Sequence, residues 1–184
     1  MYEKKMDEDI TKLLSPYRCI LVPIARNATG SMTYVLKQFR SNYTSKEIRD
    51  NIDEIEWKNR IKFAFVRHPL DRFISAIAQA NAPHIGIRIN SGIEGPSFNY
   101  HIFRPQVEYL TEDIDFVGKY ENLEEDWKKV NNLIGIDLPL IHSNETEAKR
   151  KLTKEEIEWA IEYYKEDFKR FKYKINAKNY SIHN

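Results

Sequence analysis

The chain has 184 residues, of which 41% are apolar and 31% are charged, and its formal net charge is +1. This balance is typical of one globular domain, expected over residues 1–184, and gives no electrostatic case for nucleic-acid partners. No apolar run approaches the roughly 20 residues that a membrane-spanning helix needs. Cys19 is the only cysteine, and the charged N-terminus lacks the apolar core of a signal peptide. We therefore expect a cytoplasmic protein without an intrachain disulfide.

The first predicted elements are a short buried strand over residues 18–24 and a helix over residues 31–40. Apolar residues recur in the helix at three- and four-residue spacing, which indicates one buried face. Thr44 and Glu47 then form a capping box for a second helix that runs toward Trp57.

Residues 61–66, IKFAFV, predict a second buried strand, and Pro69 starts a helix that continues to about Ala80. The following segment, residues 82–101, holds three glycines and two prolines without clear periodicity. A loop this long in a compact domain is often functional. A short helix is expected around Arg104–Leu110.

The last third of the chain predicts a third strand over residues 115–120 and a helix over residues 123–134. Thr153 and Glu156 form another capping box, which opens a helix with an apolar face. That face contains Ile157, Ile161, Tyr164, Phe168 and Phe171. Strands that alternate with helices predict an α/β fold with a small, mostly parallel sheet flanked by helices, in the three-layer arrangement of P-loop proteins.

Residues 26–31, RNATGS, link the first predicted strand to the first predicted helix. Unpaired amides at the start of a helix, together with the helix dipole, form an anion site. Gly30 permits close approach of the anion, and Arg26 adds a positive charge. The predicted binding residues are Arg26, Asn27, Ala28, Thr29, Gly30, Ser31 and Met32, with side-chain donors on Asn27, Thr29 and Ser31. An ordinary strand-to-helix turn with a serine N-cap is the alternative.

A second group of polar residues begins where the second predicted strand ends. Arg67 follows the strand, and Arg72, Ser75 and Gln79 share one helix face at three- and four-residue spacing. Arg67 and Ser75 would converge on one phosphate, with the arginine as a fork and the serine as a short donor. The alternative is a solvated Arg67, or one paired with Asp71. The Walker pattern with its lysine is absent, which weakens an interpretation as a magnesium-dependent ATP or GTP site.

Together these motifs resemble the sulfotransferases that use 3′-phosphoadenosine-5′-phosphosulfate (PAPS), and most closely the carbohydrate branch with the heparan 2-O and chondroitin enzymes. In that family a P-K-x-x-G-T-S loop holds the 5′-phosphosulfate, and R-x-P-x-x-R-x-x-S holds the 3′-phosphate. The second form is met by Arg67, Pro69, Arg72 and Ser75. The segments HIFRPQVEYL, DFVGKYENLEEDW and IEYYKEDFKRFKY resemble later segments of the same branch, so the resemblance extends over residues 18–173.

The first loop departs from the family form because Ala25 replaces proline and Arg26 replaces lysine. Arginine keeps the positive charge but has a different reach, which affects catalytic efficiency more than binding. The resemblance implies in-line transfer of a sulfuryl group from PAPS, without a metal, to a hydroxyl of a small molecule or glycan. It implies that Arg26 stabilises the leaving oxygen and that His101 is the general base.

Other interpretations remain open at the level of sequence. His84, Glu94 and His68 are alternative bases, and residues 82–101 are the expected acceptor loop. One alternative function keeps nucleotide binding but loses turnover, as the exchange at Arg26 suggests. Others are a small nucleotide or sugar kinase and a purely structural or partner-binding domain.

Overall fold

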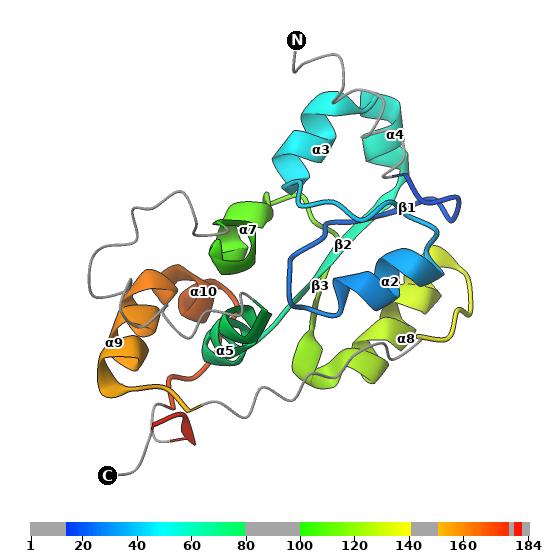
Figure 1. The fold of residues 1–184 in the computed structure, drawn as a ribbon. Coiled ribbons are helices and arrows are strands. Elements are labelled where there is room, and N and C mark those ends of the chain that lie inside the picture. The colour runs from blue at the N-terminus through cyan, green and yellow to red at the C-terminus, as the bar shows by residue number, and fades with distance from the viewer. Residues whose placement is uncertain (1–13, 80–99, 141–150, 177–178, 182–184) are drawn as a thin grey trace. The chain divides into compact units, whose positions relative to one another are not determined.

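The computed structural model describes residues 14–79, 100–140, 151–176 and 179–181 (Figure 1). The backbone forms two compact units. The first, called here the sheet unit, contains Met1–Val66 and Glu108–Asn144. The second, the helical unit, contains Arg67–Val107 and Glu145–Asn184. A single domain over residues 1–184 therefore stays a prediction.

The sheet unit is built on three parallel strands in the order β1-β2-β3. They are β1 (Cys19–Leu21), β2 (Ile61–Val66) and β3 (Phe116–Lys119). Leu21 lies opposite Phe63, and Phe63 lies opposite Phe116 in turn. Parallel strands joined through helices confirm the predicted α/β class.

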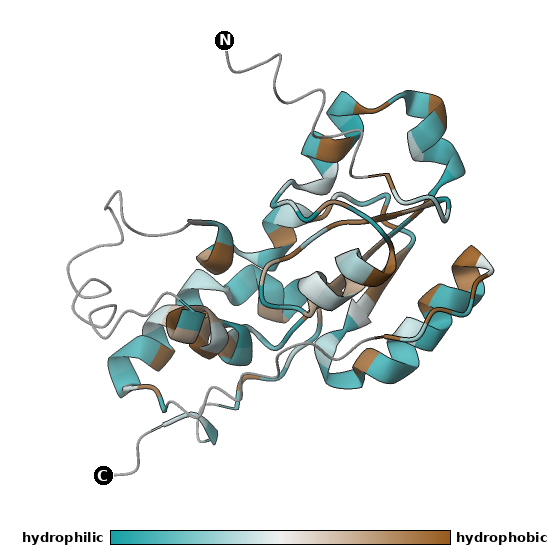
Figure 2. Cartoon of the chain, turned by 45° about the vertical axis from the view of Figure 1, so that its right-hand side comes forward, coloured by the Kyte–Doolittle hydropathy of each residue, from teal (hydrophilic) through white to brown (hydrophobic). Residues whose placement is uncertain are grey.

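The helices of the sheet unit are α2 (Thr29–Val35), α3 (Ser45–Asn51), α4 (Glu54–Asn59) and α8 (Leu123–Ile134), with a 3₁₀ turn, η2 (Tyr120–Asn122), before α8. Alternate residues of β1 and β2 pack with apolar residues of α2 and α8 on one face of the sheet. This core consists of Cys19, Leu21, Met32, Leu36, Phe63, Phe65, Trp127 and Val130. Figure 2 shows the apolar stretches along the strands.

The predicted helix over residues 31–40 is wrong at both ends, because α2 begins at Thr29 and ends at Val35. Lys37 adopts a left-handed conformation with φ 51°, and the Gln38 amide donates to the Thr33 carbonyl at 2.9 Å. This is the Schellman pattern of a helix end, formed here with lysine at the position that glycine usually fills. The left-handed Lys37 therefore reverses the direction of the chain after the helix.

The side chain of Gln38 then bonds to the edge strand β1. Its Oε1 accepts from the Leu21 amide at 3.1 Å, and its Nε2 donates to the Leu21 carbonyl at 2.8 Å. One side-chain amide thus occupies both polar groups that Leu21 turns away from β2. Strand β1 is also shorter than the predicted residues 18–24.

Between the first two strands, the predicted single helix toward Trp57 is two helices. The predicted capping box of Thr44 and Glu47 is confirmed at the start of α3. Ile52 is extended, and the Asp53 side chain accepts from the Ile55 amide at 2.7 Å to begin α4. An aspartate N-cap of this kind starts a new helix rather than continuing the old one. The predicted strand over residues 61–66 and helix over residues 123–134 have the observed bounds.

The helical unit contains α5 (Pro69–Gln79), α7 (Tyr100–Phe103), the first residues of a 3₁₀ helix, η1 (Gln106–Tyr109), α9 (Lys154–Tyr163) and α10 (Lys165–Arg170). Helices α7 and α9 pack against α5. The Phe73 ring contacts the rings of Phe103, Trp159 and Tyr164 with centroids 5.5–6.2 Å apart. Tyr164 donates its buried hydroxyl to the Phe103 carbonyl at 2.7 Å, and burial raises the pKa of that hydroxyl.

Two predictions for the helical unit need correction. The expected helix around Arg104–Leu110 is the shorter η1 instead, because Pro105 disfavours a helical backbone at the residue before it. The expected long helix from Thr153 has its capping box, but it divides at Tyr164, where φ is −101° and ψ is 18°. The expected loop of residues 82–101 lies outside the described residues, apart from its last two.

Candidate functional site

The loop between β1 and α2 has an unusual backbone. Arg26 and Ala28 are both left-handed, with φ of 72° and 58°. For residues with a Cβ, this conformation costs about 1–2 kcal/mol each. Such strain persists only where the surroundings hold it, and it is concentrated at functional sites.

Internal hydrogen bonds hold this loop in its strained form. The Thr29 hydroxyl donates to the Ile24 carbonyl at 2.6 Å, and Asn27 Nδ2 donates to the Phe65 carbonyl in β2 at 2.8 Å. The amides of Ser31 and Met32 both donate to the Ala28 carbonyl, at 3.1 and 3.3 Å. Because the proton of the Thr29 hydroxyl is used inside the loop, Thr29 offers an anion its amide rather than its side chain.

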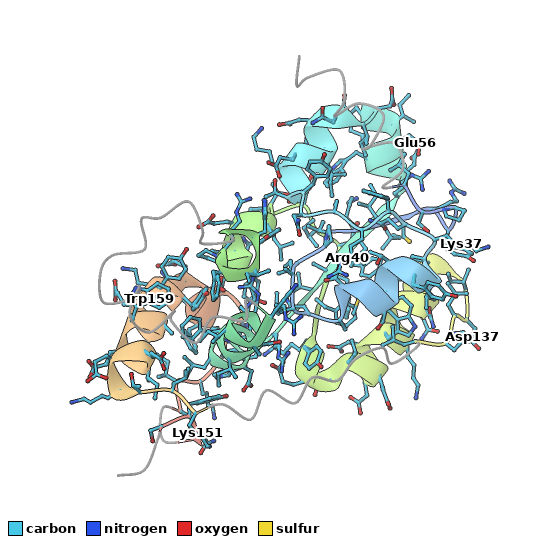
Figure 3. All side chains as sticks on the ribbon, in the orientation of Figure 1. Lys37, Arg40, Glu56, Asp137, Lys151 and Trp159 are labelled. Atoms are coloured by element: carbon cyan, nitrogen blue, oxygen red, sulfur yellow. The ribbon has the colours of Figure 1, made fainter. Side chains whose placement is uncertain are left out.

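The first amides of α2 belong to Thr29 and Gly30, positions that have no intrahelical acceptor. The exposed Arg40 lies beside them, because a Cβ built on Gly30 would be 3.8 Å from Arg40 Nη1 (Figure 3). Sequence reasoning missed Arg40 because a helix through residue 40 would place it about 15 Å from Gly30. The early end of α2 returns the chain to this position.

The second candidate segment starts the helical unit. Arg67 is half-buried, whereas Arg72 and Ser75 on α5 are each only 1% exposed. Gln79 is exposed. Of the three residues predicted to share a polar helix face, Arg72 and Ser75 are therefore buried and Gln79 is solvated. The Asp71 carboxylate accepts a hydrogen bond from the Tyr180 hydroxyl at 3.1 Å. A pairing of Arg67 with Asp71 stays an open alternative.

The backbone of Arg67 is held by a side chain far along the sequence. Gln106 Oε1 accepts from the Arg67 amide, and Gln106 Nε2 donates to the Arg67 carbonyl, both at 2.9 Å. Asp167 accepts in turn from the Gln106 amide at 2.9 Å, from Gln106 Nε2 at 3.3 Å and from the Val107 amide at 2.8 Å. Burial raises the pKa of the Asp167 carboxyl, opposed by these donors and by the charge of Arg72.

The candidate general bases differ in their surroundings. His101 is an exposed residue of the short helix α7. The His68 ring stacks on Tyr180 at a centroid distance of 5.4 Å, and its Nε2 lies 3.1 Å from the Lys174 carbonyl oxygen. These contacts favour a structural role for His68. His84 and Glu94 lie outside the described residues.

Comparison with known proteins gives one finding. Residues 95–174 match the model of the sulfotransferase family. The match contains the segments at 101–110, 115–127 and 161–173, and it excludes the first loop and the Arg67–Ser75 segment. No curated protein and no solved structure matches the chain significantly. Within the described ranges no helix combines the length and apolar character that a bilayer span requires. The match over residues 95–174 shows that the C-terminal half of this chain is similar to the sulfotransferase family.

Proposed function

We propose that this chain is a PAPS-dependent sulfotransferase that transfers a sulfuryl group to an acceptor hydroxyl. The observation that carries the proposal is the family match over residues 95–174. The Arg67–Ser75 motif lies upstream of that match and supports the same family independently. Carbohydrate is the proposed acceptor class, and it rests on the resemblance to the carbohydrate branch alone.

The strained loop is the proposed site of the 5′-phosphosulfate. The amides of Thr29 and Gly30 would donate to its oxygens, and Arg26 and Arg40 would add positive charge. Preformed donors of this kind do not have to reorganise when charge develops on the leaving oxygen, and this is a main source of catalysis in group transfer. The energy stored at Arg26 and Ala28 is consistent with a loop shaped for a ligand.

The start of the helical unit is the proposed site of the 3′-phosphate. Arg67 would bind two phosphate oxygens through its guanidinium, and Ser75 would donate its hydroxyl. Arg72 on the same helix is a buried cation within the electrostatic range of Asp167.

In the proposed reaction the acceptor oxygen attacks sulfur in line with the leaving phosphate oxygen. One sulfur–oxygen bond forms while the bond from sulfur to the phosphate oxygen breaks, and 3′-phosphoadenosine-5′-phosphate (PAP) leaves with its electron pair. The acceptor proton goes to a general base, for which His101 is the proposed residue. The loop donors stabilise the charge that develops on PAP.

Calorimetric binding of PAP tests the nucleotide site. We expect micromolar binding by the wild type, with much weaker binding of 5′-AMP and magnesium-ATP. Arg67→Ala should abolish the preference for PAP over AMP. Arg49→Ala is the matched control, because Arg49 is an exposed arginine in an ion pair with Asp113, 3.1 Å away. No PAP binding, or a preference for magnesium-ATP, would overturn the proposal.

Turnover is tested separately by following sulfate transfer from PAPS to a panel of sugars and simple alcohols. Transfer to any acceptor establishes the enzyme, and a His101→Ala variant that binds PAP normally but loses transfer identifies the base. Normal PAP binding without transfer to any acceptor would favour a nucleotide-binding protein that has lost turnover.

A further inference from the structure

A buried side-chain network beside the proposed 3′-phosphate site contacts the backbone of Arg67. We propose that Gln106, oriented by Asp167, is a positioning residue that fixes how Arg67 presents its guanidinium to the 3′-phosphate. The inference rests on the proposed function and names two residues that neither the motif nor the resemblance assigned to the site.

The first step of the argument is the double hydrogen bond. Gln106 bonds to both the amide and the carbonyl of Arg67, each at 2.9 Å. A planar amide that bonds to both polar groups of one residue restrains the peptide planes on either side of it. Gln106 is 0% exposed, so water does not compete for these bonds. The Cα–Cβ direction of Arg67 is therefore set before any ligand arrives.

The second step is the orientation of the Gln106 amide itself. Asp167 is also 0% exposed, and its carboxylate lies 3.3 Å from Gln106 Nε2. Both Asp167 oxygens accept hydrogen bonds from N–H groups, so the carboxyl group selects the orientation with the Gln106 nitrogen toward Asp167 and the Arg67 carbonyl. Oε1 is then left to face the Arg67 amide. Asp167 also anchors the Gln106 and Val107 amides, which fixes the start of η1.

The third step separates positioning from mere stability. Gln38 makes the same double hydrogen bond to Leu21, at 3.1 and 2.8 Å, and is also nearly fully buried. Leu21 has no side-chain chemistry to direct, so the Gln38 bonds hold the edge strand β1 and orient no functional group. Gln106 makes its bonds to a residue with a functional side chain. The two glutamines therefore form a matched pair for experiment.

The test compares Gln106→Met with Gln38→Met, since methionine keeps the length of glutamine and removes its hydrogen bonds. Residues that orient metal ligands through hydrogen bonds are typically worth about 10- to 100-fold in metal affinity, and we apply the same scale to Gln106. We expect Gln106→Met to weaken PAP binding by that factor and to leave 5′-AMP binding within about twofold, because AMP lacks the 3′-phosphate. Gln38→Met should leave the ratio of the two affinities unchanged.

Hydrogen exchange provides a direct readout of the bond itself. The Arg67 amide should be protected in the wild type and in Gln38→Met, and should exchange faster in Gln106→Met. If Gln106→Met does not fold, Asp167→Asn serves as the second variant. In this variant one carboxylate oxygen becomes an NH₂ group, so Gln106 loses one hydrogen-bond acceptor. We expect the preference for PAP over AMP to fall, but by a smaller factor than in Gln106→Met.

The outcomes separate the inference from the function on which it rests. A wild type that does not prefer PAP to AMP overturns the proposed function, and the inference with it. A wild type with that preference, combined with a folded Gln106→Met that retains it, overturns the inference alone. An equal loss of preference in both methionine variants would also overturn it, because stability would then explain the effect.

Discussion

The first loop and the Arg67 segment differ in how the protein prepares them. The first loop is fixed by nearby residues of its own unit and contains two left-handed residues, Arg26 and Ala28. The Arg67 segment has no positive φ over residues 67–79, and it is fixed by the distant residues Gln106 and Asp167. Backbone strain therefore shapes the loop whose amides and Arg26 are the proposed donors, and buried side chains orient the segment in which the Arg67 guanidinium is the proposed donor. Substitutions in the first loop and in the Arg67 segment should accordingly have different effects on stability and binding.

The largest effect is expected for Asp167→Ala in the helical unit. It would leave three N–H donors without this acceptor and would remove a negative charge within the electrostatic range of the buried Arg72. Removing one partner from a buried charge network costs about 3–5 kcal/mol. Urea denaturation should show this loss, with Glu166→Ala on the exposed side of α10 as the control. Equal stability of the two variants would mean that the network contributes little.

A comparable effect, on rate rather than stability, is expected for Arg26→Ala. Loss of one preorganised donor to a leaving oxygen costs about 100- to 1,000-fold in turnover. Arg26→Lys should keep most of the activity, since it keeps the charge. Arg18→Ala is the control because Arg18 is an exposed arginine that is also left-handed, with φ 55°. A rate for Arg26→Ala near that of Arg18→Ala would remove Arg26 from the mechanism.

The strain in the first loop predicts a gain of stability for Ala28→Gly. Glycine adopts a φ of 58° without steric cost, so the free energy of unfolding should rise by about 1 kcal/mol. In the helical unit, Ala76→Gly within α5 should lower it by a similar amount, because that backbone is helical. Thermal denaturation of both variants checks the opposite signs, and a destabilised Ala28→Gly would mean that packing of the Ala28 methyl group against the core outweighs the strain.

The smallest effect is expected for Arg40→Ala. An exposed charge beside a phosphate contributes about 0.2–1 kcal/mol, or roughly a factor of one and a half to five in affinity. PAP and AMP should weaken equally because both carry the 5′-phosphate. Lys37→Ala, which removes an exposed charge from the same segment, should change neither. An effect confined to PAP would assign Arg40 to the 3′-phosphate instead.

Local signals in the sequence predicted the elements that depend on local interactions. The run IKFAFV, both capping boxes and the helix over residues 123–134 were confirmed because propensity and periodicity determine them. The end of α2 was missed because a lysine takes the left-handed position that glycine usually signals. Gln38 and Gln106 could not be recognised because their partners lie 17 and 39 residues away. The roles of Arg26, Arg67, Ser75 and His101 stay predictions.

The bonds between Gln38 and Leu21 have a consequence for how the chain behaves in concentrated solution. Strand β1 forms one edge of the sheet. An open edge offers unpaired amides and carbonyls to the strands of other molecules and so promotes aggregation. The Gln38 side chain fills both hydrogen-bonding positions of Leu21 with a group that no second chain can extend. Its replacement by methionine would reopen that edge, so Gln38→Met should self-associate during refolding more readily than Gln106→Met.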